Sequence, residues 1–117
     1  MAVKNYDAKP GANGVKVITW ELAPGDTAQP YEPEWNEAAT GSVQFSGTFG
    51  GAVVGLRQSN DGAEWWRVFL EDGNTFAGED DARNFCTTDF KSAARYLRPN
   101  IFGGLAYAIT VTMVLRG

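Results

Sequence analysis

Several short segments of the chain alternate strictly between large apolar and small or polar side chains, and this pattern limits the folds open to it. In residues 105–116 every second position from Tyr107 onward carries a large apolar side chain: Tyr107, Ile109, Val111, Met113 and Leu115. Residues 15–22 and 42–49 show a similar alternation. Successive side chains of a β-strand point to opposite faces of a sheet, so a period of two indicates strands with one buried face.

Turn sequences separate these segments at short intervals. Gly50-Gly51 lies between two alternating runs, and Asn60-Asp61-Gly62 precedes the run that begins at Trp65. Short turns of this kind join antiparallel neighbours into hairpins. We therefore predict six to eight strands in an all-β fold, an antiparallel β-sandwich that is Ig-like or jelly-roll-like. Its expected core comprises Ile18, Trp20, Val43, Phe45, Val54, Leu56, Val68, Tyr96, Ile109, Val111 and Met113.

The length of the chain fits one domain. It has 117 residues, a size at which one hydrophobic core is self-sufficient. We expect residues 15–117 to form a single β-sandwich domain and residues 1–14 to form a flexible N-terminal arm. The arm combines charged residues, a proline and small residues, and Val3 and Tyr6 are its only sizeable apolar groups.

The composition argues against several functions. The net charge is −4 and the basic residues are scattered, so nucleic-acid binding is not expected. No apolar run approaches the roughly 20 residues that span a bilayer, so no membrane partner is expected. Histidine is absent, which removes the base of Ser/His/Asp and Cys/His sites. We expect no catalysis, no cofactor and no metal, and we interpret Glu79-Asp80-Asp81 as a solvated loop.

The segment from Cys86 to Pro99 shows a weaker pattern than the strands described above. Cys86, the only cysteine, is expected to be a small buried hydrophobe. Residues 88–93 fit either a single helical turn or an irregular crossover. Residues 94–98 then read as a strand with Tyr96 facing inward, which stops at Pro99.

The aromatic residues offer the best candidates for binding. The long connection 23–41 carries Tyr31, Glu34 and Trp35, and it either covers an open end of the sandwich or is an exposed docking loop. Trp65 and Trp66 are adjacent and must point to opposite faces of their strand, so we expect one in the core and the other outside it. An exposed tryptophan would suit a protein contact or a sugar-stacking platform.

With these residues in view, the chain resembles small bacteriophage virion proteins over residues 42–116. The resemblance is carried by these features: the stretch from Gly47 to Ala52, then Leu56, then Ser59-Asn60-Asp61-Gly62 followed by Trp65 or Trp66, residues 94–99, Gly103-Gly104 and the alternating final strand. Proteins of this class are β-sandwiches that act as head decoration (cement) proteins or as head–tail and tail components.

The resemblance implies a capsid decoration protein that binds and stabilises the major capsid shell. The alternatives are a head–tail or tail component, or a carbohydrate-binding virion module. It implies synthesis in the bacterial host cytoplasm, a place on the virion, the major capsid protein or other virion proteins as partners, and a homo-oligomer, most simply a trimer. From their apolar or charged side chains in segments without a strand pattern, we expect the assembly contacts to be Val3, Tyr6, Tyr31, Glu34 and Trp35.

Overall fold

A computed structural model describes residues 2–11, 14–33, 39–68, 85–87, 89–104 and 106–116. These residues form β-strands without an α-helix, so the predicted all-β fold is confirmed. There are more strands than the six to eight expected, because several have only two to four residues. The strands are β1 (Ala2–Lys4), β2 (Asp7–Pro10), β3 (Lys16–Leu22), β4 (Asp26–Ala28), β5 (Ala39–Thr48), β6 (Val53–Ser59), β7 (Trp66–Arg67), β8 (Phe85–Cys86), β9 (Phe90–Ser92), β10 (Tyr96–Phe102) and β11 (Ala108–Arg116).

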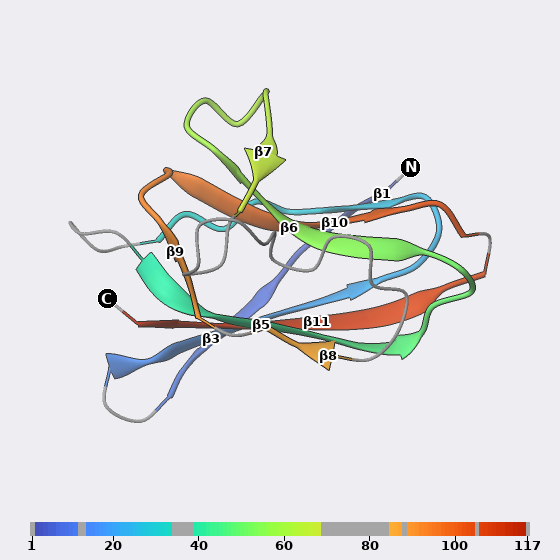
Figure 1. Ribbon diagram of the computed structural model, residues 1–117, viewed down its shortest axis with the longest axis horizontal. Coiled ribbons are helices and arrows are strands. Elements are labelled where there is room, and N and C mark those ends of the chain that lie inside the picture. Colours follow the sequence, from blue (N-terminus) through green and yellow to red (C-terminus); the bar gives the residue numbers. More distant parts are fainter. Residues whose placement is uncertain are drawn as a thin grey trace.

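The strands make two facing sheets (Figure 1). The larger sheet has the order β2-β3-β11-β5-β8, and β9 also pairs with β5. The second sheet has the order β10-β6-β7. β1 and β4 form a separate parallel pair beside them. The large sheets are antiparallel throughout, which is the arrangement of a β-sandwich.

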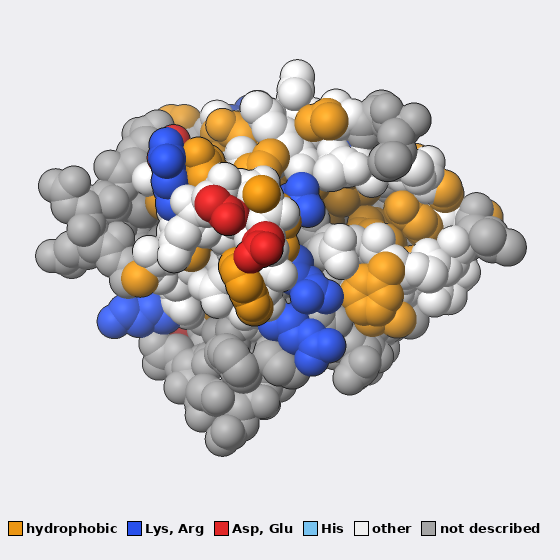
Figure 2. Space-filling view, turned by 90° about the horizontal axis from the view of Figure 1, so that it is seen from above, with side chains coloured by type: hydrophobic (Ala, Val, Ile, Leu, Met, Phe, Trp, Pro, Cys, Tyr) orange, Lys and Arg blue, Asp and Glu red, His pale blue; other side chains and the backbone are white. Residues whose placement is uncertain are grey.

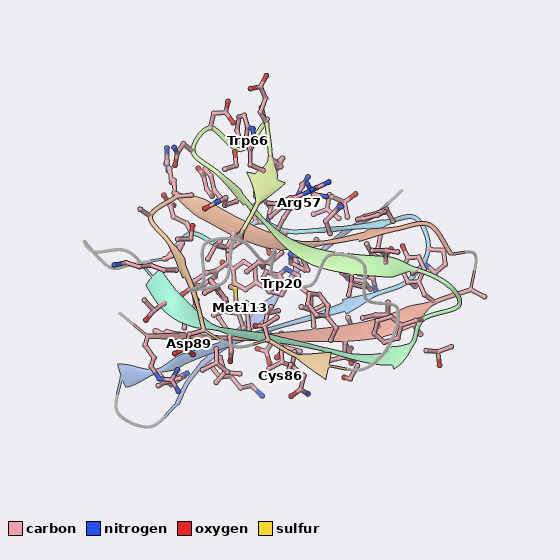
Figure 3. All side chains as sticks on the ribbon, viewed as in Figure 1. Trp20, Arg57, Trp66, Cys86, Asp89 and Met113 are labelled. Atoms are coloured by element: carbon pink, nitrogen blue, oxygen red, sulfur yellow. The ribbon has the colours of Figure 1, made fainter. Side chains whose placement is uncertain are left out.

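β11 is the central strand of the larger sheet. It pairs along its length with β3, from Ile109 opposite Leu22 to Leu115 opposite Lys16. On its other side it pairs with β5 from Thr48 to Thr40. Side chains at every second position of these strands are buried between the sheets, and Trp20 and Met113 are both fully buried there (Figure 3).

The predicted core is confirmed except at Tyr96. Every other residue of the predicted set is buried, whereas Tyr96 is partly exposed and Leu97 is fully buried instead. β10 also continues through Pro99. The N–H of Leu97 donates to the carbonyl of Tyr31 and not to β6, so the nitrogen of Pro99, two residues on, also faces this outer edge. A proline is tolerated there because no ladder hydrogen bond is lost.

The N-terminal segment has regular structure where an arm was predicted. β1 pairs with β4, and β2 pairs antiparallel with β3. Tyr6, between them, packs edge-on against Trp20 and Tyr31, with ring centroids 6.0 and 5.2 Å apart. All of β2 is exposed, so this strand has no buried face that would produce an alternating pattern in the sequence.

The segment before β10 also differs from both predicted forms. Residues Phe90–Ser92 form the strand β9, paired with β5 from Gly41 to Ala39, while Thr88 lies outside the described residues. Phe90 is fully buried, and the hydroxyl of Ser92 donates to Gln58 at 2.6 Å. One core aromatic and one polar bond hold this short strand, where a helical turn or an irregular crossover was expected.

Close packing of β5 against β11 gives the first testable prediction. A Cβ on Gly41 would overlap the carbonyl oxygen of Val114 and lie 3.1 Å from the Cα of Leu115. We expect Gly41→Ala to lower the free energy of unfolding by about 3 kcal/mol, since rigid backbone must move. Gly11→Ala is the control: its Cβ would meet Val15 at an ordinary 3.4 Å, and we expect a change below about 1 kcal/mol. Equal urea-unfolding midpoints for the two variants would contradict this register.

Candidate functional site

The predicted contact residues do not gather on one surface. Val3 is 65% exposed, Tyr6 is partly buried, and Tyr31 is buried. Tyr31 exchanges two backbone hydrogen bonds with Leu97, of 2.8 and 2.9 Å. The part of the long connection around Tyr31 therefore covers its own sandwich. Glu34 and Trp35 lie outside the described residues.

The tryptophan pair lies where the β6–β7 hairpin projects from the sandwich (Figure 1). The prediction that one of the two belongs to the core is wrong. Trp66 is 58% exposed and points away from the body (Figure 3), and Trp65 is partly exposed. Val68 takes the core position, and its N–H donates to the carbonyl of Leu56 at 3.2 Å. Trp65 and Trp66 come before Val68 in the projecting hairpin, so both rings lie outside the core.

Asp61 holds the turn of this hairpin. Its Oδ1 accepts hydrogen bonds from the backbone N–H groups of Ala63 and Glu64, at 2.9 and 3.0 Å, and from the hydroxyl of Ser59 at 3.0 Å. The Ser59 oxygen in turn accepts from the N–H of Gly62. Carboxylates in turns characteristically bond the backbone two or three residues on. The turn therefore positions both tryptophans.

Three arginines lie in one row across the three-stranded sheet. Arg98 of β10 is opposite Arg57 of β6, and Arg57 is opposite Arg67 of β7. Leu97 and Pro99 point into the core, so Arg98 and its neighbours in the row lie on the outer side. Figure 2 looks onto this side and shows Lys and Arg side chains gathered across its middle.

The guanidinium of Arg98 stacks on Trp65, with its Cζ 4.1 Å from the ring centroid. Burial lowers the pKa of Arg98. The same outer side carries Tyr96 near the hairpin and Phe102, 42% exposed, at the far end of β10. We call this surface the arginine–tryptophan face; its residues are Arg57, Arg67, Arg98, Trp65, Tyr96 and Phe102.

Trp66 borders a separate hollow on the other side of the hairpin. The hollow has a volume of about 370 Å³ and is lined by Gln58, Ser59, Asn60, Trp66, Ala93 and Ala94. Two of its polar groups already have partners: Gln58 donates to the carbonyl of Arg67, and Asn60 accepts from the N–H of Arg95. An indole beside amide groups is an arrangement suited to the face of a sugar ring.

The remaining candidates carry little chemistry. Cys86 is exposed, so its predicted burial is wrong; β8 lies at a sheet edge with this side chain outward (Figure 3). The carboxylates of 79–81 fall outside the described residues. Within the described ranges, no group of three His, Cys, Asp or Glu residues could hold a metal ion. Those ranges also contain no helix long and apolar enough to cross a membrane.

The chain matches no protein-family model, no curated protein sequence and no solved structure. The assignment of a function therefore depends on the geometry described above.

Sequence reasoning missed the arginine–tryptophan face for a specific reason. Its three arginines are far apart in the sequence, and only the register between β10, β6 and β7 brings them into line. The adjacent tryptophans were the one available signal, because exposed aromatic and arginine side chains are typical of binding surfaces.

The pKa of Asp61 gives a prediction of pH dependence. Hydrogen bonds from the N–H groups of Glu64 and Ala63 lower this pKa below its usual value. Its stabilising effect is therefore complete above the unfolded-state pKa, near 3.9, and is lost as the pH falls through the folded-state value. We expect the free energy of unfolding to fall less for Asp61→Asn than for the unmodified chain between about pH 5 and about pH 2.

Urea unfolding across this pH range measures the difference. Asp89→Asn is a matched control, because Asp89 is exposed and forms no hydrogen bond with another described residue. If Asp61→Asn and Asp89→Asn change the pH dependence equally, the turn carboxylate has no special role.

Proposed function

We propose that this chain is a bacteriophage structural protein, a capsid decoration or cement protein that binds the major capsid shell. The observation that carries the proposal is the arginine–tryptophan face beside the projecting hairpin, with Trp66 58% exposed. Tryptophan, tyrosine and arginine are enriched at protein interfaces and supply most of their binding energy. The sequence resemblance to small virion proteins supports the same class.

This proposal changes the expected contacts. Tyr31 is buried and Tyr6 packs against the chain's own aromatic residues, so neither is available as a main anchor. Val3 remains an exposed candidate. The hairpin and the arginine–tryptophan face take over as the principal surface, where a buried anchor typically contributes about 2 kcal/mol or more.

The wider setting of the proposal follows from the resemblance. The protein is made in the host cytoplasm, acts on the virion, forms homo-oligomers with a trimer as the simplest assembly, and has a binding role in place of a catalytic one. A head–tail or tail position fits the same surface, because a position on the virion does not follow from the fold.

A carbohydrate-binding virion module is the second candidate. It is favoured by the hollow of about 370 Å³ that joins the exposed indole of Trp66 to Asn60 and Gln58. If this candidate is correct, we expect the protein to bind glycans on an array. Trp66→Ala should abolish this binding, whereas Trp65→Ala, which lies outside the hollow, should preserve it.

Quantitative mass spectrometry of purified phage particles tests the proposed function. For the phage that encodes this chain, we expect the protein in a fixed, stoichiometric ratio to the major capsid protein, since a decoration protein occupies repeated shell positions. A handful of copies per particle would instead place it at the head–tail junction or tail. Absence from purified particles would contradict a structural role on the virion.

A further inference from the structure

The row Arg98–Arg57–Arg67 places like charges opposite each other on neighbouring strands. Such cross-strand pairs destabilise a sheet. Neighbouring strands lie about 4.8 Å apart, so the three side chains start within about 10 Å of each other. The row therefore does not stabilise the fold by its own charges.

Arg98 differs from the other two members of the row in its interactions. Arg57 and Arg67 make additional interactions within the chain. Arg98 stacks on Trp65 and is partly desolvated, and no carboxylate of a described residue forms a salt bridge with it. Removing a charge from water is unfavourable unless a counter-charge compensates.

Two acidic side chains of neighbouring segments already have partners within the chain. Glu32 binds the Nε of Arg95 at 2.6 Å, and Asp61 holds the hairpin turn through backbone hydrogen bonds. Glu64 is adjacent to Trp65 in the sequence, but it forms no salt bridge with Arg98. A carboxylate from outside the described residues would add the counter-charge that Arg98 lacks there.

The Arg98 guanidinium lies over the ring of Trp65 and donates no hydrogen bond to another described residue. The N–H donors of arginine lie in the plane of the group, whereas the indole covers one of its faces. A carboxylate can accept two parallel hydrogen bonds at that edge. Trp65 thus orients the arginine without using its donors.

We propose that Arg98, oriented by Trp65 and flanked by Arg57 and Arg67, binds a carboxylate on an acidic, partly apolar segment of a partner protein. This inference rests on the proposed function and identifies the chemistry of the shell surface that the protein recognises.

Two observations favour a polypeptide over a nucleic acid. The chain carries a net charge of −4, which repels an extended polyanion before contact. Tyr96 and Phe102 lie on either side of Arg98 along β10 and on the same outer side of the sheet, where Phe102 is exposed and Tyr96 is partly exposed. They offer apolar contacts that a sugar–phosphate backbone cannot use well. A segment with both carboxylates and aliphatic side chains complements both features.

The test uses an end-blocked synthetic peptide in which glutamate alternates with valine, titrated into the full chain by isothermal calorimetry. We expect measurable binding that weakens as salt is added. Arg98→Gln should reduce the affinity about tenfold, equivalent to about 1.4 kcal/mol. Arg116→Gln is the matched control: it removes the same charge from an exposed site at the end of β11, and we expect no change.

Arg98→Lys is the second variant and keeps the positive charge at the site. It loses the planar fork of donors, so we expect an intermediate loss of affinity. Circular dichroism and thermal unfolding establish that each variant is folded. Full affinity in Arg98→Lys would contradict a paired carboxylate contact, whatever the behaviour of Arg98→Gln.

Three results overturn the inference: no binding of the peptide at about millimolar concentration, equal binding by the unmodified chain and Arg98→Gln, or tighter Arg98-dependent binding of a single-stranded oligonucleotide. The titration uses the isolated protein without phage particles, so its outcome is independent of whether the protein is found on virions. Peptide binding by a protein that is absent from virions would leave the inference standing and refute only the virion role.

Discussion

The two-sided pairing of β11 is the constraint on which the rest of the structure depends. It joins β3 and β5 into one continuous ladder, and it places the side chains of Ile109, Val111 and Met113 against the opposite sheet. The approach of β5 is so close that Gly41 cannot carry a side chain. Burial of these apolar side chains supplies the main driving force for folding, and the ladder holds them on one face of the sheet.

The second sheet packs on this core with one side and carries the arginine–tryptophan face on the other. β6 and β10 bury Leu56 and Leu97 on their inner side, and the same alternation directs Arg57 and Arg98 outward. Their register is fixed because a slip of one residue would expose the core positions. The β6–β7 hairpin extends this sheet past the core, so Trp66 is exposed and Trp65 is partly exposed. The proposed binding surface is thus the part of the sheet that the core does not need.

How much of this was predictable depends on whether a strand has a buried face. The long half-buried strands β3, β5, β6 and β11 were recognisable from alternation alone. β2 lacks a buried face, so its sequence has the polar, irregular pattern of a flexible arm. In β10 the predicted inward residue is Tyr96, which is large and aromatic, whereas the buried residue is its neighbour Leu97. Leu97 pairs through its backbone with Tyr31, a contact between distant segments. The arginine row depends on pairing between distant segments, which local patterns do not encode.

We propose that the arginine–tryptophan face is the surface that joins this protein to its partner. A cryo-electron microscopy map of the phage particle can test this contact. We expect the face to lie against the shell, with Arg98 within hydrogen-bonding distance of a carboxylate of the neighbouring protein. A sandwich bound to the shell through the outer side of its larger sheet, with Arg98 and Trp65 facing solvent, would contradict it.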